Sequence, residues 1–168
     1  MRFGWIKGVA AAAALGVGAC GGGASDDEAQ RAAAFFMQSN ARAEGVTTLP
    51  SGLQYKVVRS GPEGGVSPDA NDLVRVNYEG ALADGTVFDS SFERGAPYVT
   101  TPENVIDGWK EGLQLMSVGD EWILYVPPEL GYGERGGPPV IPPHAVLVFR
   151  VQLLDVAKTP GGEAAANG

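Results

Sequence analysis

The chain has 168 residues and a formal net charge of −8, with twelve lysines and arginines against twenty aspartates and glutamates. This length suits one compact domain with a short extension, and the acidic charge disfavours a nucleic-acid partner. The single cysteine and the single histidine exclude an intrachain disulfide and the usual cysteine- or histidine-rich metal sites, so we expect no metal.

The first twenty residues have the pattern of an export signal. Arg2 and Lys7 precede an uncharged apolar run at 8–19, which is shorter than the roughly 20 residues of a membrane-spanning helix. The run ends at Cys20 in the tetrad Val-Gly-Ala-Cys, which resembles the lipidation motif of bacterial lipoproteins. We expect residues 1–19 to be a signal peptide and Cys20 to be lipidated. The alternative is an ordinary signal-peptidase cut nearby that leaves Cys20 unmodified.

A glycine-rich spacer and a helix follow the cysteine. Ser25 with Glu28 three residues later forms a capping-box pattern, and an alanine-rich stretch ends at Gly45, so we predict a helix over about 26–44. This helix is either a dimerisation or docking helix or a short helix that packs on its own domain, and the sequence leaves both open. We accordingly expect a monomer or a weak dimer.

From residue 53 onward the apolar residues repeat with a period of two, as in half-buried strands. We predict strands in an antiparallel sheet, separated by turn signals, at residues 53–59, 74–79, 122–126 and 146–154. Only the stretch from Val105 to Met116 has helical spacing, with Trp109 and Leu113 on the same face. One short helix against one sheet predicts an α+β domain.

The composition divides the chain into five segments. The last is rich in glycine and alanine and has no periodicity, so we expect it to be disordered. The predicted segments are the signal peptide 1–19, a lipidated cysteine and spacer 20–25, a short helix and linker 26–51, the folded domain 52–156 and the tail 157–168.

The sequence does not support a dinucleotide-binding site, a nucleophile–histidine pair or a catalytic carboxylate pair. Residues 131–136 match the dinucleotide pattern G-x-G-x-x-G, but prolines on both sides prevent the helix that the pattern requires. His144 has no nucleophile partner that the sequence identifies, and Asp89 beside Phe88 is the one carboxylate with an apolar flank that suggests a raised pKa. A glycosidase-type carboxylate pair is therefore poorly supported.

Ordered blocks of sequence point to a family. They resemble, at compatible spacing, the FK506-binding-protein family of peptidyl-prolyl cis-trans isomerases, at residues 76–80, 85–91, 105–109, 116–119, 132–133 and 141–149. The residues before the domain are similar to the junction in exported bacterial members related to the macrophage infectivity potentiator. The resemblance implies a bent antiparallel sheet wrapped around one short helix, with an apolar active-site pocket between them.

The resemblance also implies which residues form the site. The catalytic residues would be Tyr78, Asp89, Tyr132 and Phe149, and the substrate-binding pocket would add Phe88, Tyr98, Val105, Ile106, Trp109 and Val140. Trp109 would form the floor, the Ile106 N–H and the Tyr132 hydroxyl would bind substrate carbonyls, and Asp89 would lie at the rim. Tyr98 and Gly137 depart from residues common in the family, which affects the expected peptide preference.

The implied activity is the isomerisation of X-Pro bonds, without a cofactor. The implied partners are proline-containing peptides and unfolded exported proteins, with macrolides of the FK506 or rapamycin type as candidate ligands. The alternative is a membrane-tethered chaperone that binds such segments without turnover, whereas a carbohydrate-binding domain would need exposed aromatic platforms. Because no aspartate follows Cys20, we expect a periplasmic location, lipid-anchored at the outer membrane.

Overall fold

The computed structural model describes residues 25–160, so the predicted signal peptide and Cys20 lie outside the described residues. The helices are α1 Asp26–Asn40, α2 Ser91–Arg94 and α3 Asp107–Leu115, and the 3-10 helices are η1 Pro102–Asn104, η2 Pro128–Leu130 and η3 Gly133–Arg135. The strands are β1 Val46–Thr48, β2 Gln54–Arg59, β3 Leu73–Leu82, β4 Val87–Ser90, β5 Tyr98–Thr100, β6 Glu121–Val126 and β7 Leu147–Ala157. No helix among them is long and apolar enough to cross a bilayer.

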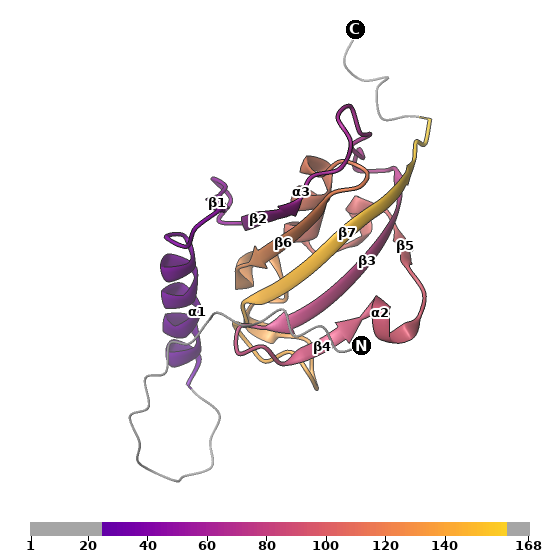
Figure 1. The fold of residues 1–168 in the computed structure, drawn as a ribbon. Helices are drawn as coiled ribbons and strands as arrows, with labels where there is room; N and C mark the ends of the chain where they lie inside the picture. The colour runs from indigo at the N-terminus through magenta and orange to yellow at the C-terminus, as the bar shows by residue number, and fades with distance from the viewer. Residues whose placement is uncertain (1–24, 161–168) are drawn as a thin grey trace, which may run out of the picture.

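The strands form one antiparallel sheet that wraps around α3. Their order is β1-β2-β6-β7-β3-β4, and β5 also pairs with β3. The long central strands β3 and β7 pair along their whole length, and Figure 1 shows them running diagonally in front of α3. The predicted α+β fold, a bent antiparallel sheet with one short helix and a preceding N-terminal helix, is confirmed.

Helix α3 packs unusually close to the sheet. Trp109 and Leu113 are buried on the face that the sequence predicts, and Gly108 and Gly112 lie beside them at the same four-residue spacing. A Cβ atom on Gly108 would lie 2.6 Å from a methyl carbon of Val126. The two glycines therefore let the helix backbone approach β6, and this sets the depth of the space between helix and sheet.

The capping box predicted at the start of α1 is wrong. The side chain of Ser25 caps nothing, and its carbonyl oxygen instead accepts hydrogen bonds from the N–H groups of Glu28 and Ala29. The helix also ends at Asn40, four residues before the predicted end. Gln54 explains this end, because its side chain donates to the Met37 carbonyl at 2.8 Å and accepts from the Asn40 amide at 2.8 Å.

Two parts of the chain are more ordered than predicted. Residues 46–48, expected to be linker, pair with β2 as strand β1. Strand β7 runs to Ala157, and the next two residues are bonded to the domain rather than disordered, since Lys158 forms ion pairs with Asp69 and Asp72. Of the expected disordered tail, residues 161–168 lie outside the described residues.

Candidate active site

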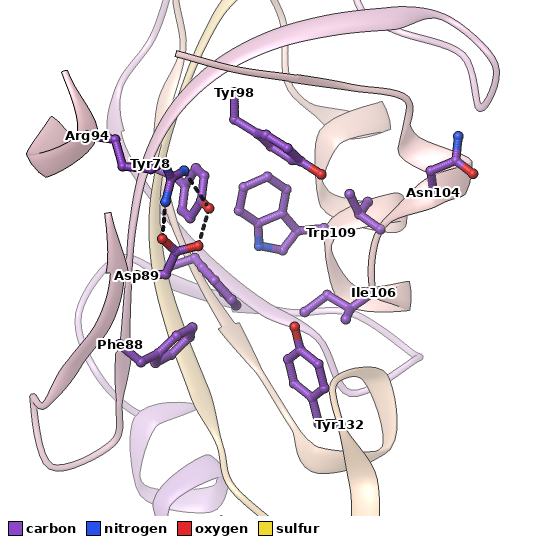
Figure 2. Close-up of a pocket in the computed structure, with 11 residues that line it drawn as sticks. Tyr78, Phe88, Asp89, Arg94, Tyr98, Asn104, Ile106, Trp109 and Tyr132 are labelled. Carbon is purple, nitrogen blue, oxygen red and sulfur yellow. Dashed lines mark hydrogen bonds and ion pairs between the residues drawn. The ribbon is translucent and has the colours of Figure 1, made fainter. Parts of the chain in front are cut away.

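A cavity of about 550 Å³ opens between α3 and the concave side of the sheet. Its lining comes from strands β3, β4, β5 and β7, from α2 and η1, from the start of α3 and the residues just before it, and from the turn before η3. The lining residues are Tyr78, Phe88, Asp89, Arg94, Tyr98, Asn104, Val105, Ile106, Trp109, Tyr132 and Phe149. Figure 2 shows Trp109 deep in this cavity, with Tyr98, Ile106 and Tyr132 around its mouth.

Aromatic rings set edge to face build the floor and the inner wall. The Trp109 ring lies 5.1 Å from Tyr78 and 5.2 Å from Phe149, both nearly perpendicular to it, and Phe149 meets Phe88 at 5.6 Å. This arrangement is favourable because the positive edge of one ring meets the negative face of the next. Gly80 makes room for two of the rings, since a Cβ atom there would lie 2.7 Å from Phe149 and 2.8 Å from Phe88. The result is a rigid, apolar surface.

One polar cluster closes the side of the pocket. The Tyr78 hydroxyl donates to Asp89, Arg94 forms an ion pair with the same carboxylate, and Arg94 Nη2 also donates to the Tyr78 hydroxyl oxygen at 3.0 Å. The guanidinium carbon lies 5.4 Å from the centre of the Tyr78 ring. Burial of the phenol, together with its hydrogen bond to Asp89, raises the pKa of Tyr78 above its ordinary value of 10.0. Tyr78 therefore stays protonated at neutral pH.

The mouth of the pocket carries further hydrogen-bonding groups. Ile106 precedes the first residue of α3, and within residues 25–160 its N–H donates to no other group. Tyr132 lies in the turn before η3 with 44% of its surface exposed, and Figure 2 shows its hydroxyl directed toward Ile106. Asn104, at the end of η1, donates its side-chain amide to Thr101 at 2.6 Å.

The structure brings together all the residues expected at the site except Val140. Val140 is 55% exposed and does not line the cavity. Arg94 and Asn104 do line it and were missed. A sequence signal for Arg94 exists in Ser90 and Glu93, which form a capping-box pattern that begins the short helix α2: the Ser90 side chain accepts from the Glu93 N–H at 3.4 Å.

The lining offers shape and apolar surface rather than acid-base or nucleophilic groups. Its one carboxylate, Asp89, is held by Tyr78 and Arg94, and the lining contains no cysteine, histidine or lysine. Nor does any group of three or more histidine, cysteine, aspartate or glutamate residues in the described part of the chain suit a metal ion. Such a pocket can bind an apolar group and orient a carbonyl beside it.

A larger cavity, of about 890 Å³, lies between α1 and the domain. His144 lines it, with 8% of its surface exposed and with Nε2 of its ring 3.5 Å from Nε2 of Gln30 on α1. Its other lining residues are mainly small, prolyl or amide side chains from α1 and from the loops beside β2 and β6. His144 therefore belongs to the contact between α1 and the domain and not to the aromatic pocket.

Comparison with protein families covers most of the described chain. A family model described as "FKBP-type peptidyl-prolyl cis-trans isomerase" matches residues 64–154. A second, described as "Domain amino terminal to FKBP-type peptidyl-prolyl isomerase", matches residues 22–57. The two matches leave residues 58–63 between them, which include the end of β2 and the turn after it.

Individual curated proteins are also similar to this chain. "Peptidyl-prolyl cis-trans isomerase Mip" of Coxiella burnetii is 51% identical over 123 residues, 73% of this chain and 53% of that protein. "Outer membrane protein MIP" of Legionella longbeachae is 45% identical over 125 residues, 73% of this chain and 52% of that protein. The chain thus spans about half the length of these curated relatives.

A solved structure matches most of the chain. The crystal structure of a peptidyl-prolyl cis-trans isomerase from Pseudomonas syringae pv. tomato is 35% identical and superposes with a TM-score of 0.76. The match covers 82% of this chain and 100% of that one. With the aromatic pocket between sheet and helix, these matches show that the chain belongs to the FKBP-type peptidyl-prolyl cis-trans isomerase family.

Proposed function

We propose that this protein is a peptidyl-prolyl cis-trans isomerase that acts on proline-containing segments of exported proteins. The observation that carries the proposal is the mainly apolar aromatic cavity, whose floor is the buried Trp109 and whose one carboxylate, Asp89, is held by Tyr78 and Arg94. Rotation about an X-Pro bond breaks no covalent bond, so a site of this kind has what the reaction needs. Family membership supports the same reaction.

The chemistry follows from the electronic structure of the amide. The barrier to rotation is about 20 kcal/mol because resonance keeps the bond planar, and uncatalysed exchange takes roughly 10–100 s. Conjugation and charge separation are lost in the twisted transition state, so an apolar, water-poor pocket disfavours the planar amide more than the twisted one. A thousandfold acceleration requires only about 4 kcal/mol.

Individual roles follow from where the groups lie. The proline ring would rest on Trp109, and the Ile106 N–H and the Tyr132 hydroxyl would donate to substrate carbonyls at the pocket mouth. Tyr78 and Phe149 would form the wall, and Asp89 would hold the Tyr78 hydroxyl and Arg94 in place. These assignments are supported by the placement of the side chains around the cavity.

Exchanging a tryptophan tests the proposal. We expect Trp109→Leu to lower kcat/KM for a short X-Pro peptide at least tenfold, because it removes the floor. Trp122→Leu is the matched control: this tryptophan is also buried, but it stacks on Tyr55 at 4.4 Å and does not line the pocket. It should lower the melting temperature and leave kcat/KM unchanged.

The same assay separates turnover from simple binding. A wild-type protein that suppresses aggregation of a proline-free client, yet does not accelerate isomerisation, would contradict the proposal and favour the chaperone. Macrolides of the FK506 or rapamycin type should compete with the peptide for the pocket. Inhibition that persists undiminished in Trp109→Leu would place the macrolide elsewhere.

We further propose that the protein is exported and anchored through lipidated Cys20 at the outer membrane, facing the periplasm. The proposal rests on the apolar run that ends at Cys20 and on the name of the Legionella relative, "Outer membrane protein MIP". Two or more acyl chains would hold the protein firmly, whereas one chain binds only marginally.

Membrane fractionation followed by intact mass measurement tests the anchor. We expect wild type in the membrane fraction with the added mass of the lipid, and Cys20→Ser in the soluble fraction without it. Soluble wild type with an unmodified Cys20 would contradict the anchor and leave the proposed isomerase activity untouched.

A further inference from the structure

Strand β3 has a gap along one of its edges, beside the pocket. On one side it pairs with β7 throughout, but on the other side it changes neighbour, from β5 at 74–76 to β4 at 79–81. Between them, at Asn77 and Tyr78, no strand of the described chain pairs with this edge. The gap falls on the residue whose ring forms the pocket wall.

Ser91 fills the gap with its side chain. It is the first residue of α2, directly after the last residue of β4, and only 1% of its surface is exposed. Its Oγ accepts a hydrogen bond from the Tyr78 N–H at 2.8 Å and lies 3.3 Å from the Tyr78 carbonyl oxygen, to which it can donate. A hydroxyl that both accepts and donates thus replaces the backbone groups of a neighbouring strand where the chain has turned into a helix.

Helix α2 therefore binds Tyr78 through both its backbone and its hydroxyl. Its first residue binds the Tyr78 backbone, and its last residue, Arg94, binds the Tyr78 hydroxyl and Asp89. Figure 2 shows Arg94 reaching from this helix to the phenol and the carboxylate. Because the Tyr78 ring meets Trp109 edge-on at 5.1 Å, a shift of α2 against β3 would move the pocket wall and its polar cluster together.

We propose that Ser91 is a positioning residue for the active site: it fixes α2 against the unpaired edge of β3 and thereby sets the positions of Tyr78 and Arg94 in the pocket wall. The inference rests on the proposed isomerase function. Ser91 does not line the cavity, so it acts through these two residues and touches no substrate.

The test is a double-mutant cycle with Arg94. We expect Ser91→Ala to lower kcat/KM for an X-Pro peptide roughly fivefold to tenfold, because it leaves the Tyr78 N–H without its partner and loosens α2. In an Arg94→Gln background, where the last residue of α2 no longer binds the Tyr78 hydroxyl and Asp89, the same change should lower kcat/KM by a smaller factor than in the wild-type background. Asp72→Asn is the control, since it replaces a buried acceptor oxygen outside the pocket with an NH2 group and should lower only the melting temperature.

The outcomes separate positioning from a purely structural role. Ser91→Ala that is less stable but has wild-type kcat/KM well below its melting temperature would overturn the proposal, as would equal losses in both backgrounds. Wild type that binds the peptide without turnover would overturn the proposed function instead. In that case the double-mutant cycle is measured with the peptide Kd in place of kcat/KM. An unchanged Kd in Ser91→Ala would then overturn the positioning role.

Discussion

Tyr132 is the most exposed hydroxyl donor at the pocket, and two glycines flank it. We predict that Tyr132→Phe lowers kcat/KM by about fivefold to thirtyfold, equivalent to about 1–2 kcal/mol, because one oriented hydrogen bond to the substrate is lost. The fold should be unaffected, since the ring remains and the hydroxyl binds no other described residue. Steady-state isomerisation kinetics measure kcat/KM, and a thermal melt checks that the fold is unaffected.

Tyr125→Phe is the matched control for this change. It also removes one tyrosine hydroxyl, but from the β6 residue that faces Phe36 of α1 rather than from the pocket. We expect wild-type kinetics from it. Equal activity of Tyr132→Phe and wild type would remove the hydroxyl from the mechanism.

The titratable groups of the pocket predict an activity that hardly changes between pH 6 and 8. Burial and the hydrogen bond to Asp89 raise the pKa of Tyr78 above 10.0, so the phenol keeps its proton throughout this range. The single histidine of the chain, His144, lines the other cavity and takes no part in this pocket. A bell-shaped profile of kcat/KM in protein shown to remain folded would indicate acid-base catalysis that the pocket does not explain.

At the scale of elements, the contact between α3 and β6 determines how deep the pocket is. Gly108 meets the side chain of Val126 and Gly112 meets that of Leu124, so the helix adds no side chain of its own at these contacts. The aromatic floor sits on the same helix, at Trp109. A change that pushes α3 outward therefore affects both stability and the pocket.

We predict that Gly108→Ala destabilises the protein by about 1–3 kcal/mol. Alanine would ordinarily favour a helix by up to about 1 kcal/mol over glycine, but here its Cβ would lie 2.6 Å from a methyl of Val126. Valine is stiff about χ1 and this one is fully buried, so it cannot move aside and the steric term prevails. Urea unfolding measures the loss, with the exposed Lys110→Ala on the same helix as a control that should change little. A stabilised Gly108→Ala would show that the contact is looser than the structure has it.

At the scale of the whole molecule, the end of β7 is tied to the loop before β3. Asp72 is buried and accepts hydrogen bonds from the N–H groups of Asp69 and Thr159, and Lys158 binds it at 2.9 Å. Burial alone would raise the pKa of Asp72, but these partners outweigh it and lower the pKa from 3.8 to about 2. Lys158 and Thr159, which follow the last strand, thus fix the end of β7 to the loop before β3.

This shift predicts how stability depends on pH. A carboxyl whose pKa is lower in the folded state contributes stability above its unfolded pKa of 3.8, and this is lost as the pH falls toward about 2. The contribution is on the order of 2 kcal/mol. Wild type should therefore exceed Asp72→Asn in unfolding free energy at pH 6, and the difference should shrink between pH 4 and 2. The exposed Asp155→Asn should show no such convergence, and a constant difference for Asp72→Asn would contradict the assignment.

The sequence by itself determined the fold class and most of the pocket. Apolar residues repeat every two residues in a half-buried strand and every three or four in an amphipathic helix, so the long strands and α3 could be predicted from the sequence. The ordered sequence blocks with matching spacing identified the family. The short strands β4 and β5 and the helix α2 have too few residues for a period to show. Val140 was assigned to the pocket because of its place in the pattern, yet it is exposed on the loop after η3.

Only the tertiary structure decided which local signals are used. The same capping-box pattern occurs at Ser25 and at Ser90, but only the second serine caps its helix through its side chain. Likewise, the side chain of Gln54 in β2, 14 residues beyond Asn40, binds the end of α1. Ser91 binds α2 to an unpaired strand edge, and Arg94 reaches the pocket from the same helix. Local patterns state which hydrogen bonds a segment can form, and contacts between distant segments select among them, because each donor and acceptor is satisfied by whichever partner the packed fold brings within reach.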